Sequence, residues 1–280
     1  MARQRRIATI LVLALGRVGW AEAQPTASAV PVGPPGAWLA PVLRAALDAG
    51  VDHGPLDAVL RSAAHDGGID YRAVAADPRL AAYLGALSRA VLPEPGPGRT
   101  ALAINAYNAF VLDTLSKHWP VTRVVEIDGF FDHLTHSLAG RDLTLDELED
   151  DLLRPLHDPR LHAALFLGAR GGPALRPEAY VASAERLEAQ LDDQAQRWVR
   201  DPAVLRFDRA AHQLWLSPIF RWYAVDFEAV GGPAGFAHKY LADEPTRQAL
   251  LAGGYELAHL AFDWTVTPAA TPAAAPPAGR

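Results

Sequence analysis

The segment 100–118 constrains the fold most, because its residues predict a long helix that is apolar nearly all the way round. A helix without a polar face is buried by other parts of the chain. Apolar spacing predicts further helices at 37–49, 54–64, 78–91, 144–152, 235–241 and 246–251, with one or two more within 177–200. Candidate strands are fewer and short, at 69–71, 121–127, 162–167 and 256–264. The pattern therefore predicts an α+β fold: a helix-rich single domain with a small, mostly antiparallel sheet.

Residues 1–23 have the features of an export signal. Arg3, Arg5 and Arg6 precede an apolar run at 7–16, and the small residues Ala21 and Ala23 precede a predicted cut after Ala23. The run is shorter than the roughly 20 residues that cross a bilayer as a helix, and no later stretch qualifies. We therefore expect an exported protein, periplasmic or secreted, with no integral membrane segment after signal cleavage. An uncleaved N-terminal anchor is the alternative.

Two segments of low apolar content flank the predicted domain. Residues 24–36 are rich in Pro, Ala and Val, and residues 267–280 are rich in Ala and Pro. Such compositions bury too little apolar surface to offset the entropy of ordering, so we predict a disordered linker and a disordered tail. The remaining residues, 37–266, suit one globular domain.

Composition excludes several classes of function. Removal of residues 1–23 takes away four of the 26 basic and one of the 32 acidic residues, which leaves a net charge of −9. An acidic surface does not favour a nucleic-acid partner. Because the chain has no cysteine, it has neither disulfides nor thiolate chemistry. His133 and His136 have no third ligand at a compelling spacing, so no metal site is predicted, and no cofactor is predicted either.

The segment 162–180 is the first candidate site. It is predicted to be a buried strand, then a glycine-rich turn at 168–173, then the beginning of a helix. Arg170 and Arg176 flank this turn, where guanidinium and backbone N–H groups could hold a carboxylate or phosphate; they could equally be solvated charges. His162, at the front of the predicted strand, is either a core side chain or a group that contacts a ligand or catalyses a reaction.

Three polar residues of the apolar helix form a second candidate. Asn105 and Asn108 share about the same face, and Tyr107 lies between them. A buried amide needs hydrogen-bond partners, so the two asparagines either line a polar pocket or bind neighbouring backbone. On the next acidic helix, Glu149 is placed by helical spacing beside Leu145, Leu148 and Leu152, whereas its acidic neighbours fit a solvated helix start.

Several segments together resemble the domain-of-unknown-function 547 (DUF547) family, in the same order over about residues 40–266. They are 68–71, 104–109, 145–149, 158–165, 168–170, 175–180, 216–223, 226–227 and 262–264. The family has no assigned reaction, and a papain- or transglutaminase-like core is suggested by the resemblance alone. The family pattern has cysteine at the positions of Gly172 and Leu167, and histidine where Asp150 stands. The resemblance thus implies that Gly172 is a lost nucleophile position.

These observations leave three hypotheses. In the first, a polar pocket lined by His162 and by Asn105, Tyr107, Asn108, Arg170 and Arg176 binds a small anionic or peptide-like ligand, without thiol catalysis. In the second, His162 acts as a general base on water, oriented by Glu149, in a hydrolase or transferase. In the third, the protein is a periplasmic interaction scaffold. The first two require side chains that are distant in sequence to meet around one hollow.

Overall fold

The computed structural model describes residues 50–65 and 68–269, and these belong to the larger of two units, Ala49–Arg280. The predicted signal peptide, the linker and the helix at 37–49 lie outside the described residues. The helices and helical turns of the described part are α2 (Gly54–Ala63), α3 (Tyr71–Ala76), α4 (Pro78–Ser88), α5 (Pro97–His118), η2 (Val124–Glu126), α6 (Leu145–Leu148), η3 (Glu149–Leu153), η4 (Arg154–Leu156), α7 (Leu161–Ala164), α8 (Ala184–Arg200), α9 (Ile219–Trp222), α10 (Ala224–Phe227), η5 (Glu228–Val230), α11 (Gly232–Tyr240) and α12 (Glu244–Ala252).

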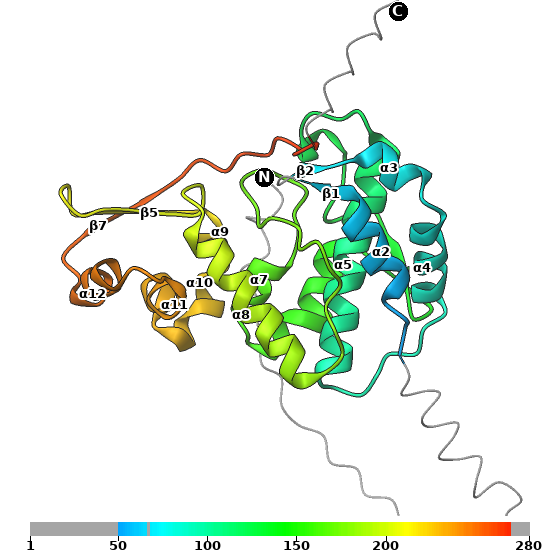
Figure 1. Cartoon of the computed structure of the whole chain (residues 1–280), viewed down its shortest axis with the longest axis horizontal. Coiled ribbons are helices and arrows are strands. Elements are labelled where there is room, and N and C mark those ends of the chain that lie inside the picture. The colour runs from blue at the N-terminus through cyan, green and yellow to red at the C-terminus, as the bar shows by residue number, and fades with distance from the viewer. Residues whose placement is uncertain (1–49, 66–67, 270–280) are drawn as a thin grey trace, which may run out of the picture. The chain divides into compact units, whose positions relative to one another are not determined.

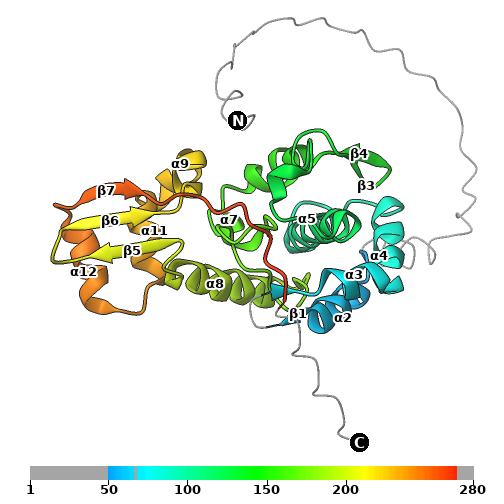
Figure 2. The ribbon, with the colours of Figure 1, turned by 90° about the horizontal axis from the view of Figure 1, so that it is seen from above.

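The long apolar helix is confirmed as α5, the centre of the core. Every residue from 100 to 112 is buried, and α3, α4, α6, η3 and α8 all pack against it; Figure 2 shows α3 and α4 beside it. Pro97 occupies the first turn, where its missing N–H costs no helical hydrogen bond. The helix ends before Pro120, because Trp119 adopts the extended backbone that a following proline favours.

The strands of the described residues are short and form three small sheets. Two are antiparallel hairpins, formed by β1 (Ala64–His65) with β2 (Gly68–Ile69) and by β3 (His136–Leu138) with β4 (Arg141–Leu143). In the third sheet β6 (Gln213–Leu216) lies between an antiparallel β5 (Leu205–Asp208) and a parallel β7 (Glu256–His259). The predicted α+β class with mostly antiparallel pairing is confirmed, and nothing in these sheets supports a papain- or transglutaminase-like core.

Two predicted strands are wrong. Residues 121–127 contain the turn η2, and the segment 162–167 begins with the short helix α7 before its backbone becomes extended at Leu165. A six-residue apolar run does not distinguish a buried strand from a buried helix segment. Among the described residues the extended part has no partner strand, and the Phe166 N–H donates instead to the side chain of Asn108 on α5.

The end of the described chain runs as an extended segment over several elements, the red trace that reaches β2 in Figure 1. Isolated bridges join Thr265 to Arg123, Val266 to Ala169 and Pro268 to Ile69. A Cβ atom on Gly68 would lie 2.3 Å from the carbonyl oxygen of Pro268, so this crossing requires glycine. Backbone pairing thus continues past residue 267, where the sequence predicts that the tail begins.

Candidate functional site

Asn105 and Asn108 bind backbone at the end of α7 and in the irregular segment that follows it. Asn105 donates through Nδ2 to the Tyr180 carbonyl oxygen at 2.8 Å and accepts from the Tyr180 N–H at 2.9 Å. Asn108 does the same for Ala164 and Phe166, at 3.1 and 2.8 Å. Both amides thus satisfy backbone groups that no strand pairs with among the described residues. These hydrogen bonds agree with the second alternative from the sequence, in which the asparagines bind neighbouring backbone.

Two glutamines of α8 complete this support. Gln190 accepts from the Val181 N–H and donates to the Ala179 carbonyl oxygen, at 2.9 Å each. Gln194 donates to the carbonyl oxygens of Ala163 and Ala174. All four amide side chains are buried, so the irregular segment between α7 and α8 is held in one conformation by side chains of α5 and α8.

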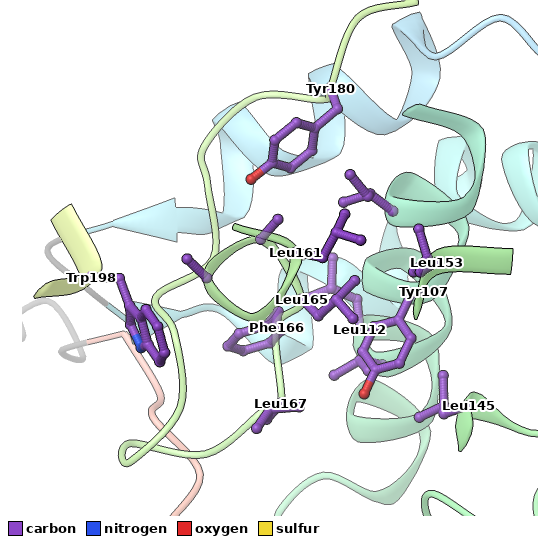
Figure 3. Packing of buried hydrophobic residues seen from close by; sticks show 14 of the residues in the cluster. Tyr107, Leu112, Leu145, Leu153, Leu161, Leu165, Phe166, Leu167, Tyr180 and Trp198 are labelled. Atoms are coloured by element: carbon purple, nitrogen blue, oxygen red, sulfur yellow. The ribbon is translucent and has the colours of Figure 1, made fainter. Parts of the chain in front are cut away.

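Tyr107 and Arg176, two further predicted ligand-binding residues, are both engaged by other parts of the chain. Tyr107 is fully buried and lies near Leu112 and Leu145 in the core (Figure 3). Arg176 donates to Glu178 and to Asp193 at 2.6 Å each, with its side chain 10% exposed. The guanidinium of Arg176 is therefore neutralised by two carboxylates of the chain itself.

His162 lies between two carboxylates. Its Nε2 is 2.9 Å from Oδ2 of Asp226 on α10, and its Nδ1 is 3.8 Å from Oε1 of Glu149 on η3. The imidazole packs on the ring of Tyr223 with centroids 4.0 Å apart, and its side chain is only 4% exposed. The predicted proximity of His162 and Glu149 is found, but 3.8 Å is longer than a hydrogen bond.

Arg154 contacts the same group of residues through Asp226. It donates to both oxygens of Asp226, from Nε at 3.0 Å and from Nη2 at 3.2 Å, and to Asp150 at 2.9 Å. Burial raises the pKa of Asp226, but the hydrogen bonds from His162 and Arg154 outweigh it and hold the pKa at about 2. Asp226 is therefore ionised at neutral pH and has a partner on each side.

We call His162, Glu149, Asp226, Arg154 and Tyr223 the His162 cluster. The sequence did not predict that Asp226, Arg154 and Tyr223 belong to it. Tyr223 donates to Oε2 of Glu149 at 3.2 Å, across 74 positions of the chain. Asp226 and Tyr223 lie in segments that carry the resemblance to DUF547, but no spacing rule connects them with a histidine 64 residues earlier. The only signal was their occurrence in the same set of matching segments.

The glycine turn borders a cavity of about 440 Å³, which we call the turn cavity. Arg170 and Gly172 line it together with Arg197 and Asp201 at the end of α8. Its other walls come from β1 and β2, from the turn and the segments on either side of it, and from the C-terminal crossing: Ala64, Gly68, Ile69, Phe166, Ala169, Pro173, Ala174, Leu175, Pro177 and Thr267. Of the predicted ligand-binding residues only Arg170 lies here, beside the predicted lost nucleophile position.

A smaller cavity of about 70 Å³ adjoins the turn cavity. The two share Ala174, Leu175, Arg197 and Asp201, and the smaller one also includes Arg176 and Trp198. Both predicted arginines thus border adjoining hollows. His162 lines neither cavity. Among the described residues it has no hydrogen bond or ion pair with Arg170, Arg176 or the two asparagines. The residues predicted to share one hollow therefore lie in two regions, one around His162 and one around the glycine turn.

Gly171 and Gly172 have different steric constraints. A Cβ on Gly171 would lie 2.7 Å from the Asp263 nitrogen, because the C-terminal crossing passes directly over it. A Cβ on Gly172 would lie 3.0 Å from Cβ of Leu167 and 3.3 Å from the carbonyl oxygen of Ala169, which are tight contacts but longer than the one at Gly171. The two positions at which the family pattern has cysteine, 167 and 172, are therefore neighbours in space.

The described part of the chain, residues 50–65 and 68–269, contains no group of three or more His, Asp or Glu side chains placed to hold a metal ion. His136, one of the two histidines considered above as metal ligands, stacks on Phe110 with ring centroids 4.6 Å apart. Burial lowers the pKa of His136 to about 4. In the same part of the chain no helix is both long enough and apolar enough to cross a bilayer.

Comparison with known proteins gives a family match over part of the chain. Residues 96–199 match the family model described as "Protein of unknown function, DUF547". The matched stretch contains α5, the glycine turn and α8, and over it the resemblance inferred from the sequence is confirmed. This helix-rich α+β region is thus a DUF547 region. No curated protein and no solved structure matches the chain.

Proposed function

We propose that this protein binds a small anionic or peptide-like ligand in the turn cavity. The observation that carries the proposal is that Arg170, Arg197 and the glycine turn border one cavity of about 440 Å³. Small-molecule sites have volumes of roughly 300–1,000 Å³, with apolar walls and a few convergent polar groups. Ile69, Phe166 and Leu175 supply apolar walls here, and the arginines supply charge that attracts an anion.

The backbone of the cavity wall adds hydrogen-bond donors. Among the described residues, the N–H groups of Ala174 and Leu175 have no acceptor, although both residues line the cavity. Because Gln194 holds the Ala174 carbonyl group, this part of the wall is fixed in place before a ligand arrives. A preformed wall with donors favours a carboxylate or a peptide group. Since position 172 is glycine, ligand binding here is not followed by thiol chemistry.

Mass spectrometry of small molecules that co-purify with the protein tests this proposal. We expect an anionic or peptide-like molecule to be released from the wild-type protein and to be depleted in Arg170→Gln. Arg123→Gln serves as the matched control, because Arg123 is exposed and does not line the cavity. Equal recovery from all three proteins would count against the turn cavity as the site.

A second candidate, water activation by His162, is favoured by the His162–Asp226 hydrogen bond of 2.9 Å. A carboxylate that binds one imidazole nitrogen orients the ring, so that the second nitrogen can accept a proton from water. Here Asp226 binds Nε2, and Nδ1 is the second nitrogen, on the side of Glu149. Hydrolysis of dipeptide and ester probes tests this candidate. We expect His162→Asn to abolish turnover with secondary structure retained. Unchanged turnover, or no turnover in the wild type, would exclude His162 as a general base for these substrates.

We propose further that the protein is exported to the periplasm or secreted, with residues 1–23 removed. Support comes from the order of arginines, apolar run and small residues at the N-terminus. Intact-mass analysis of the protein expressed with its N-terminus tests this, because cleavage leaves Gln24 as the first residue. Retention of residues 1–23 in membrane fractions would favour the uncleaved anchor.

A further inference from the structure

We infer that the ligand of the turn cavity is zwitterionic: a free amino acid or short peptide whose carboxylate lies at Arg170 and whose ammonium group lies at Asp201. The inference rests on the proposed function and specifies its ligand. It follows from two charges of opposite sign that line the same cavity.

Asp201 has a carboxylate without a cationic partner in the described part of the chain. Its Oδ1 accepts from the Ala203 N–H at 2.8 Å, in the turn that follows α8. No Lys, Arg or His nitrogen of the described residues lies within ion-pair distance of it. The three nearby acids of α8 differ in this respect, since Asp192, Asp193 and Glu188 all pair with arginine.

Arg170 is similarly available. Its side chain is 61% exposed, and its nearest acid is Asp263, at the 4.0 Å limit of an ion pair and without a hydrogen bond. Arg197 is less available, because it is 3.0 Å from Asp193. The cavity therefore presents one guanidinium and one carboxylate that are not paired with each other, although opposite charges at contact distance attract. A molecule that carries both charges satisfies both groups at once.

Calorimetric titration of the full chain with three probes tests the inference. The probes are Ala-Leu dipeptide, N-acetyl-Ala-Leu, which lacks the ammonium charge, and Ala-Leu amide, which lacks the carboxylate. We expect each blocked probe to bind about fivefold more weakly than the dipeptide, the upper range for a partly exposed ion pair. Asp201→Asn should weaken dipeptide binding to the same extent and leave N-acetyl-Ala-Leu unchanged.

The matched control is Asp208→Asn. Asp208 accepts backbone N–H bonds from Ala210 and Ala211 in the same manner as Asp201 does from Ala203, but it does not line the cavity. Asparagine retains the accepting oxygen at either position, so both variants should fold. Equal binding of dipeptide and N-acetyl-Ala-Leu would overturn the zwitterion inference and leave the proposed function standing. If none of the three probes binds, the zwitterion inference and the proposed function are both contradicted for peptide ligands.

Discussion

The His162 cluster and the turn cavity contain similar chemical groups, but they differ in how fully these groups are paired. In the cluster, Asp226 receives hydrogen bonds from His162 and Arg154, and Glu149 receives one from Tyr223. At the cavity, and within the described residues, Asp201 has no cationic partner and Arg170 forms no side-chain hydrogen bond, with Asp263 4.0 Å away. A folded chain tolerates buried charges when they are paired with one another. Unpaired charges at a cavity, in contrast, are available to a ligand. The comparison therefore assigns stability to the cluster and recognition to the cavity.

The largest expected effect is that of Asp226→Ala on stability. The substitution leaves His162 and Arg154 without their shared carboxylate, and breaking a buried pair by removing one partner costs about 3–5 kcal/mol. Because Arg154 is partly exposed, we expect the lower end, about 3 kcal/mol, in urea denaturation. Asp142→Ala, at an exposed position of β4, should change stability by less than about 0.5 kcal/mol. Similar values for both would remove the cluster from the stabilising interactions.

Asn108→Ala should destabilise the protein by about 2–3 kcal/mol, because it leaves the Phe166 N–H and the Ala164 carbonyl group buried without partners. Thr114→Val on the same helix is the control, since the Thr114 hydroxyl donates only to the carbonyl of Phe110 one turn earlier. Denaturant midpoints that coincide for the two variants would show that the amide does not hold this backbone.

Acid should weaken the cluster within a defined range of pH. The pKa of Asp226 is about 2 in the folded chain and about 3.9 when unfolded. The stabilisation due to its ionised form is therefore fully present above about pH 4 and is lost as pH falls toward 2. We expect the stability difference between wild type and Asp226→Asn to be constant above pH 4 and to shrink below it. A difference that does not change down to pH 2 would contradict the low pKa.

The smallest effect on stability is expected at the cavity, from Arg170→Gln. Because Arg170 is exposed and forms no side-chain hydrogen bond within the described chain, unfolding free energy should change by less than about 0.5 kcal/mol. Dipeptide affinity measured by calorimetry should nevertheless fall several-fold. A large loss of stability with unchanged affinity would reverse the comparison between the two regions.

Gly172→Cys sharpens the description of the cavity without relying on a known ligand. The chain has no other cysteine, so a thiol reagent reports on this position alone. We expect the thiol to react in the folded protein, because Gly172 lines the cavity and a Cβ there would lie no closer than 3.0 Å to its neighbours, Leu167 and the Ala169 carbonyl oxygen. Ala-Leu dipeptide should slow the reaction. A thiol that reacts only after unfolding would show that this position does not open into the cavity.

Local patterns predicted the helices well and the loop region poorly. The apolar run at 100–118 acts within a few turns of chain and is found as α5, which begins three residues earlier, at Pro97. The helix predicted from residue 144 is also found, with a capping box between Thr144 and Glu147 at its start. The backbone around Phe166 was predicted wrongly as a strand, because its partner is a side chain 58 positions earlier rather than another strand. Arg176 is a further example: its role depends on Asp193, 17 residues away on another element.

By itself the sequence determined that the core is built on one apolar helix, that the two buried asparagines must find partners, and that thiol chemistry is excluded. Each of these follows from composition or from spacing within a few turns of chain. Only the tertiary structure decided which acid meets His162, what Asn105 and Asn108 bind, and that Arg170 and Asp201 line the same cavity. These are contacts between segments far apart in the sequence, and their geometry depends on how the whole core packs rather than on local periodicity.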